Sequence, residues 1–180
     1  VDTPFGLHRD LCIFGNIAVA AKHALDIYGL SRVAVLDFDV HHGNGTQALL
    51  QDDPRVFFVS SHQMPLWPGS GGTHETGPHG TVMNLPLSPN SGRSEWRPSW
   101  DEALQAVRDH KPEMIFISAG FDAHEADPLA ELRWTVTDFA ELTRDICTVA
   151  NELCDGRVVS ILEGGYNLDA LAASAKAHVQ

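Results

Sequence analysis

Short apolar segments alternate with longer segments of helical pattern, and this alternation constrains the fold more than any other feature of the sequence. The apolar segments predict strands at 33–39, 56–60, 82–87, 114–119 and 158–162. The remaining pattern predicts helices at 17–28, 100–110 and 138–153, and another from about residue 168. Strands that are apolar on both faces and separated by helices are typical of a parallel sheet covered on both sides. We therefore expect a three-layer α/β/α fold.

The composition is that of a globular chain long enough for a single domain. Of the 180 residues, 43% are hydrophobic and 20% are charged, and the formal net charge is −12. This excess of acidic residues argues against direct binding to nucleic acid or to an anionic membrane. No segment approaches the roughly 18 apolar residues of a membrane span. The three cysteines lack metal-ligand spacing, so we expect free thiols in a reducing, cytoplasmic setting.

Polar side chains follow the first predicted strand directly. Asp37, Asp39 and His41 are spaced two residues apart, which points side chains to one side of an extended chain. A polar turn would explain an isolated Asp-x-Asp, but here the motif continues into His-His-Gly-Asn-Gly. In open parallel sheets the functional crevice lies outside the carboxyl ends of the strands. Two carboxylates and an imidazole that converge there would attract a cation.

Two further strands end in groups of the same kind. Asp122 follows a glycine after the predicted strand 114–119, and Gly164, Gly165 and Tyr166 follow the strand 158–162. Two carboxylates and one imidazole suit Zn²⁺ with a position left for water, although Fe²⁺, Mn²⁺ and Co²⁺ also accept such ligands. A metal activates water and polarises a carbonyl, and a phenol can stabilise the oxyanion. The implied chemistry is metal-assisted hydrolysis of an amide.

The motifs resemble those of zinc-dependent histone deacetylases and bacterial acetylpolyamine amidohydrolases, which share the arginase/deacetylase fold. The matching segments are DFDVHHGNGTQ (37–47), SAGFDAH (118–124), DPL (127–129) and EGGYN (163–167). Shorter segments at 16–21, 60–62 and 68–71 match in the family's order, so the resemblance covers essentially the whole chain. Asn44, where other branches have Asp, is typical of the class II and bacterial type.

The resemblance implies two ion sites and a catalytic hydroxyl. The implied zinc ligands are Asp39, His41 and Asp122, and Tyr166 supplies the hydroxyl that stabilises the transition state. Asp37 and Asn44 match the positions that orient the family's catalytic His-His pair. Asp37, the Ser60 hydroxyl and the backbone carbonyls of Asp39, His41 and Ser61 would surround a structural K⁺ ion.

The implied substrate is an acetyl-lysine peptide or an acetylated polyamine. Trp67 and Leu129 fall at positions that line the acyl-lysine channel, and Gly164 and Gly165 let the backbone approach the ligand. Leu11 stands where the family usually has an aromatic residue, so one wall of the channel would be aliphatic. The sequence leaves the acyl-chain preference open, and a homo-oligomer is possible.

The family's Pro-Gly-His-His segment, which carries the general base, does not occur in the 180 residues. In the family's order it falls just before Val1, and so do the first strands and helices. We therefore expect the chain to be the C-terminal portion of one catalytic domain. The alternative is a non-catalytic domain that binds a metal or acyl-lysine. A manganese ureohydrolase of the same fold is disfavoured, because it needs Asp-x-His-x-Asp ligands.

Residues 1–180 alone are expected to be inactive on acetyl-lysine peptides, since a positioned base contributes roughly 10²–10⁴-fold to such a reaction. Extension upstream through a His-His segment should restore hydrolysis. A fluorogenic acetyl-lysine substrate, with zinc added, compares the two proteins. Metal-dependent turnover by residues 1–180 alone would show that the base has been misplaced.

Overall fold

Five parallel strands form one sheet in the computed structural model, which describes residues 15–180. The strands are β1 (Val33–Asp37), β2 (Val56–Gln63), β3 (Val82–Leu87), β4 (Ile115–Ala119) and β5 (Val158–Leu162), in the order β3-β2-β1-β4-β5. The helices are α1 (Asn16–Asp26), α2 (Asn44–Leu50), α3 (Arg93–His110), α4 (Val136–Cys154) and α5 (Leu168–Val179). The predicted parallel sheet is confirmed.

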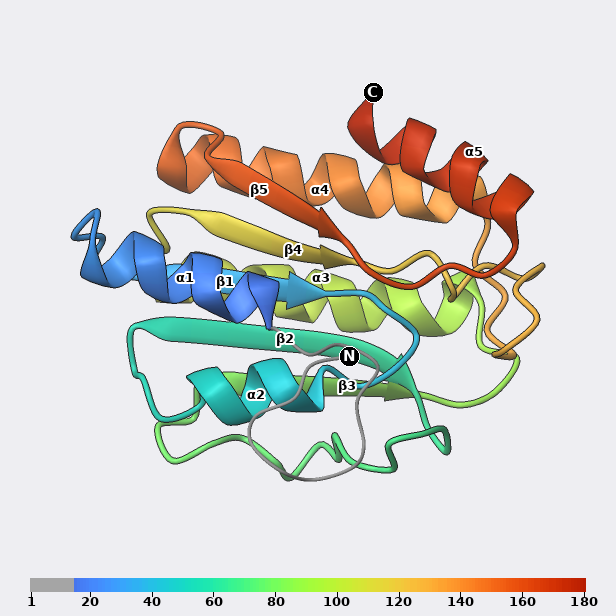
Figure 1. Cartoon of the computed structure of the whole chain (residues 1–180), viewed down its shortest axis with the longest axis horizontal. Coiled ribbons are helices and arrows are strands. Elements are labelled where there is room, and N and C mark those ends of the chain that lie inside the picture. Colours follow the sequence, from blue (N-terminus) through green and yellow to red (C-terminus); the bar gives the residue numbers. More distant parts are fainter. Residues whose placement is uncertain (1–14) are drawn as a thin grey trace.

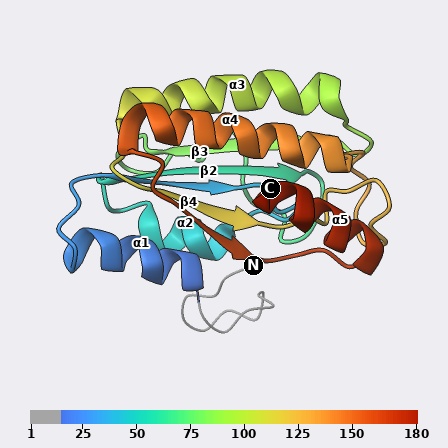
Figure 2. The ribbon, with the colours of Figure 1, turned by 90° about the horizontal axis from the view of Figure 1, so that it is seen from above.

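Helices cover both faces of the sheet. Figure 2 shows α3 and α4 on one face and α1 and α2 on the other, and α5 lies beside β5 and packs against α4. All strand arrows in Figure 1 point the same way, so the loops that follow β1, β4 and β5 gather at one edge of the sheet. No helix in the described part of the chain is long and apolar enough to cross a membrane.

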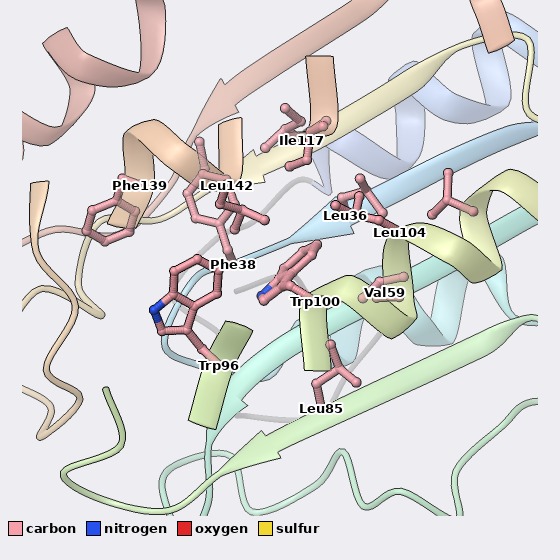
Figure 3. Packing of buried hydrophobic residues seen from close by; sticks show 14 of the residues in the cluster. Leu36, Phe38, Val59, Leu85, Trp96, Trp100, Leu104, Ile117, Phe139 and Leu142 are labelled. Atoms are coloured by element: carbon pink, nitrogen blue, oxygen red, sulfur yellow. The ribbon is translucent and has the colours of Figure 1, made fainter. Parts of the chain in front are cut away.

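Two hydrophobic clusters hold the layers together. The larger one fills the space between the sheet and the helices α3 and α4 (Figure 3). In it the rings of Trp96 and Trp134 lie 4.9 Å apart, and Leu142 is fully buried. The smaller cluster joins α1 to the other face, where Ile17 packs with Val35. Burial of these side chains supplies the main driving force for the three-layer arrangement.

The structure corrects the predicted limits of several elements. Helix α2, which begins at Asn44, was not predicted, because its seven residues are too few to show a period. Helix α3 begins at Arg93 rather than Trp100, although Pro98 lies inside it. The side chain of Glu95 accepts the backbone N–H of Gly92 at 2.8 Å and stabilises this early start.

Strand β5 is less buried than the central strands of the sheet. All residues of β1, β2 and β4 are buried, whereas Val159 and Leu162 of β5 are 36% and 60% exposed. The strand lies at the edge of the sheet, and α1 packs over β1 and β4 rather than over β5. An apolar sequence alone does not show which strand lies at an edge.

Replacing a buried leucine should cost far more stability than replacing an exposed one. Leu142→Ala removes a side chain with 0% exposure, so we expect the free energy of unfolding to fall by about 2–5 kcal/mol. Leu168→Ala, at a helix position 77% exposed, is the matched control and should change it by less than about 0.5 kcal/mol. Urea unfolding measures both, and equal losses would contradict the described core.

Candidate metal centre

Three ligating side chains converge at the carboxyl edge of the sheet. Asp39 and His41 lie in the segment after β1, and Asp122 lies in the segment after β4. Their ligand atoms are within 4.8 Å of one another. His41 Nδ1 is 3.1 Å from Asp39 Oδ1 and 3.2 Å from Asp122 Oδ2. The structure thus brings together the three residues that the spacing and the motifs single out.

Backbone N–H groups fix the two carboxylates in place. Asp39 Oδ1 accepts the N–H of His41 at 2.8 Å, and Asp122 Oδ1 accepts the N–H of Val40 at 2.9 Å. Asp37 Oδ1 in turn accepts the N–H of Asp39 at 3.0 Å. Side-chain oxygens that bond the backbone two residues further on are typical of Asp in tight turns. The chain after β1 is therefore shaped by the carboxylates that it carries.

A glycine closes the site from the β5 side. The N–H of Gly164 donates to Asp39 Oδ2 at 2.9 Å, which links the segment after β5 to the segment after β1. A Cβ at Gly164 would overlap the Asp122 carboxylate and lie 2.6 Å from Asp39 Oδ2. Any side chain here would displace the two carboxylates, so the close packing of this backbone against them requires glycine at position 164.

Burial and mutual contact shift the protonation of all three groups. Burial alone would lower the pKa of His41, but the contacts of its ring with the Asp122 and Asp39 carboxylates outweigh burial and raise the pKa to about 10. Burial and the charge of Asp39 raise the pKa of Asp122 to about 7. Burial also opposes the charge on Asp39, yet its hydrogen bonds to His41 keep that pKa below the usual value. The cluster therefore requires positive charge between its carboxylates.

The donor set fits a metal cation. Asp122 is fully buried, and its Oδ2 atom accepts no hydrogen bond from the described residues, although it faces the His41 ring. A buried polar atom rarely lacks a hydrogen-bond partner unless a ligand or an ion binds it. Two carboxylate oxygens and one imidazole nitrogen suit Zn²⁺ or a related divalent ion.

The residues implied in potassium binding lie beneath this cluster. Asp37 is opposite Ser60 in the register of β1 and β2, and Asp37 and Ser60 are both buried. The Ser61 hydroxyl accepts a hydrogen bond from Trp100 Nε1 at 3.1 Å, and Ser61 is buried in β2 next to Ser60. Burial, together with the charges of Glu163 and Asp39, raises the pKa of Asp37 well above its usual value. The identity of this ion stays a prediction.

The residues implied in catalysis and substrate binding differ in how far they are exposed. Tyr166 is 41% exposed, Trp67 is 41% exposed and Leu129 is 55% exposed. Asn44 is the first residue of α2 and half-buried. Leu11 lies outside the described residues. Their roles in catalysis and substrate binding remain predictions.

A buried polar network beside the triad was not predicted. His42 Nε2–H donates to Gln47 Oε1 at 2.9 Å, and its Nδ1 lies 2.8 Å from the Ser70 hydroxyl. The ring of His62 lies 4.8 Å from that of His42, and His62 is only 1% exposed. Burial lowers the pKa of His62 to about 4, so its ring is neutral. Because β2 extends to Gln63, His62 lies inside a strand rather than in the loop that its polar neighbours suggest.

Glu75 joins this network to the long loop between β2 and β3. Its Oε1 atom accepts the N–H groups of Gly71 and Gly72, each at 2.9 Å, and Oε2 accepts the Gln47 amide at 3.2 Å. No sequence pattern marks Glu75, because its partners are backbone groups of the same loop and one residue 28 positions away.

Comparisons with known proteins place the chain among deacetylases. The family model described as "Histone deacetylase domain" matches residues 11–180. The chain is 50% identical over 167 residues to "Histone deacetylase 10, chloroplastic" of Oryza sativa subsp. japonica. The aligned region covers 91% of this chain and 38% of that protein. It is also 42% identical over 162 residues to "Probable deacetylase" of Archaeoglobus fulgidus, and this aligned region covers 88% of the chain and 45% of that protein.

A solved structure shows the same arrangement of elements. "Crystal Structure of HDA15 HD domain" matches with a TM-score of 0.87 and 34% identity, covering 94% of this chain and 49% of that one. The likeness confirms the fold that the motifs predicted. The chain spans less than half the length of each of these three proteins.

Removing one carboxylate should remove the bound metal. Asp122→Ala takes away a fully buried ligand atom, so we expect the divalent metal content to fall to background in elemental analysis. His124→Ala is the control, because His124 Nδ1 accepts the N–H of Ala126 at 3.0 Å and its ring stacks on Phe139. Stoichiometric metal in the Asp122→Ala protein would refute the ligand assignment.

Proposed function

Because the chain belongs to the histone deacetylase family, we propose that it works in the zinc-dependent hydrolysis of the amide bond of acetylated amines. The observation that carries this proposal is the convergence of Asp39, His41 and Asp122 at the edge of the sheet from which Tyr166 also emerges. Acetyl-lysine peptides and acetylated polyamines are the two substrate classes. The 180 residues are proposed to belong to one catalytic domain.

Asp39, His41 and Asp122 would hold the zinc ion. When bound, the ion supplies a Lewis acid that polarises the scissile carbonyl and activates a water molecule. The N–H of Gly164 donates a hydrogen bond to the Asp39 carboxylate and so helps to fix the orientation of this ligand. Gly164 and Gly165 are proposed to let the backbone of this segment come close to the metal ligands and to a substrate.

Tyr166 is the proposed donor to the developing oxyanion. It lies two residues after Gly164, whose N–H contacts Asp39, and its partial exposure leaves the side chain within reach of a substrate. A phenol held by a rigid loop stabilises negative charge that appears only in the transition state. Its contribution should therefore be larger for turnover than for binding.

Trp67 and Leu129 are proposed to line the entry for the acyl-amine, with Leu11 as an aliphatic counterpart. Trp67 and Leu129 expose apolar side chains that can cover the methylene stem of a lysine or polyamine. The net charge of −12 favours cationic substrates over nucleic acids. Parallel assays on an acetyl-lysine peptide and on an acetylated polyamine distinguish the two classes.

Asp37 and Asn44 are proposed to orient the catalytic histidine pair that the resemblance implies. Asp37, Ser60 and Ser61 are proposed to hold K⁺ beneath the zinc site, where Asp37 and Ser60 are paired in the register of the sheet. A K⁺ ion there would offset the cost of burying the Asp37 carboxylate. Replacing K⁺ by a larger organic cation in the buffer tests the dependence on this ion.

The protein is proposed to act in the cytoplasm. Cys147 and Cys154 are free thiols, which is typical of a reducing compartment. Since the rice relative is named chloroplastic, cell fractionation must distinguish the cytoplasm from plastids.

Loss of the Tyr166 hydroxyl should impair turnover more than binding. Tyr166→Phe is expected to lower kcat by roughly 10²-fold or more, the scale of losing one oxyanion donor. Zinc content and affinity for a hydroxamate inhibitor should change much less. Tyr28→Phe, at a side chain 74% exposed beyond the end of α1, is the matched control and should leave kcat unchanged. A raised KM with unchanged kcat would mean that Tyr166 only helps to bind substrate.

A further inference from the structure

The carboxylate of Asp127 joins two loops at the rim of the candidate site. Asp127 is 8% exposed and lies in the segment between β4 and α4. Its Oδ1 atom accepts the N–H of Leu129 at 2.9 Å, and its Oδ2 atom accepts the N–H of Tyr166 at 2.8 Å. One buried side chain thus holds the backbone of two residues to which the proposed function gives separate roles.

These contacts lie beyond the regular part of the sheet. The pairing of β4 with β5 ends at Ala119 and Leu162, so the strand ladder does not determine where Tyr166 lies. Past that point the two segments are joined by individual hydrogen bonds, such as that from Phe121 N–H to the Gly164 carbonyl at 2.8 Å. Asp127 provides the bond of this kind that reaches Tyr166 itself.

Gly165 makes this bond important for the position of Tyr166. Its φ of +137° lies in a region that residues with side chains rarely adopt, and glycine has the widest conformational freedom. On one side of Gly165 the chain is fixed to the metal cluster through Gly164 and Asp39. On the other side Tyr166 is fixed through Asp127. The next residue, Asn167, donates its side-chain amide to the Ala126 carbonyl at 3.1 Å and caps α5. The Asp127 bond adds to these contacts a direct restraint on the Tyr166 backbone, next to the flexible Gly165.

We propose that Asp127 is a positioning residue that fixes Tyr166 relative to the metal cluster and holds it in register with Leu129. This inference rests on the proposed function of Tyr166. A carboxylate is needed because both partners are N–H donors, and each requires its own acceptor oxygen. An asparagine of the same shape has one acceptor oxygen, and its amide group would face the second N–H with a donor.

The first test measures kinetics on the zinc-loaded protein extended upstream through the His-His segment. Asp127→Asn should lower kcat by about 10-fold, since small displacements of a catalytic group slow turnover severely, while zinc content and KM change little. In a Tyr166→Phe background the same substitution should lower kcat by less than about 2-fold, because a residue that acts through another is not additive with it. Asp127→Ser is the second variant if Asp127→Asn does not fold.

Asp138 offers a matched control for effects on stability. Asp138 is 4% exposed, and its Oδ2 atom accepts the backbone N–H and the hydroxyl of Thr135, each at 2.7 Å. Its Oδ1 atom also accepts a hydrogen bond from Arg93 at 3.2 Å. Asp138→Asn should lower the melting temperature in the same way as Asp127→Asn but retain the kcat of the unchanged protein. Equal kcat in the two variants would overturn the positioning role.

The second test observes the Tyr166 backbone without any need for activity. The chain has two tyrosines, so labelling with ¹⁵N-tyrosine gives few amide signals, and the one that disappears in Tyr166→Phe belongs to Tyr166. In Asp127→Asn we expect this signal to shift and its hydrogen to exchange faster, while the Tyr28 signal and both signals in Asp138→Asn stay in place.

The two tests separate failure of this inference from failure of the proposed function. An unchanged Tyr166 signal in Asp127→Asn overturns the inference. A zinc-loaded, intact protein that hydrolyses no acetylated amine overturns the proposed function, and the amide signal then still decides whether Asp127 holds Tyr166.

Discussion

The burial of Asp39 and Asp122 beside one imidazole is the interaction on which the arrangement of the surrounding loops depends. Two carboxylates removed from water repel each other and lose their hydration, so the arrangement persists only with compensating donors and positive charge. The N–H groups of Val40, His41 and Gly164 supply the donors. The carboxylates raise the pKa of His41, which favours a positively charged ring beside them. A divalent ion would replace that proton as the source of charge.

This requirement explains why a parallel sheet suits the site. The donors come from segments that follow β1 and β5, and the carboxylates come from segments that follow β1 and β4. Parallel strands deliver all three segments to the same edge, because their carboxyl ends lie side by side (Figure 1). Glycine at position 164 then allows an approach that a Cβ would block.

The convergence of Asp39, His41 and Asp122 could be predicted from the sequence because its signals are local. Asp39 and His41 share a strand-like period, and Asp122 follows the end of an apolar strand, so strand prediction alone brings them to one edge. The limits of α2 and α3 could not be predicted. They depend on short-range contacts at the helix ends, such as the hydrogen bond from Gly92 N–H to Glu95, which an apolar pattern does not reveal.

The polar network around His42 was also beyond sequence reasoning. His62 has the polar neighbours of a loop residue but is buried inside β2. Gln47 and Glu75 are 28 positions apart, and only the folded chain places them in contact. Side-chain networks of this kind depend on distances in the folded chain, so the periodicity of the sequence does not predict them.

The hydrogen bonds of Glu75 to the loop between β2 and β3 bear on the entropy of the proposed substrate binding. Because Glu75 holds Gly71 and Gly72 and the Ser70 hydroxyl contacts His42, the loop that carries Trp67 is ordered close to that residue before any substrate arrives. A wall that is already ordered loses less conformational freedom when it closes on a flexible methylene chain. Part of the affinity for the proposed acyl-amine substrate can therefore arise from the ordered loop, without any contact between Glu75 and that substrate.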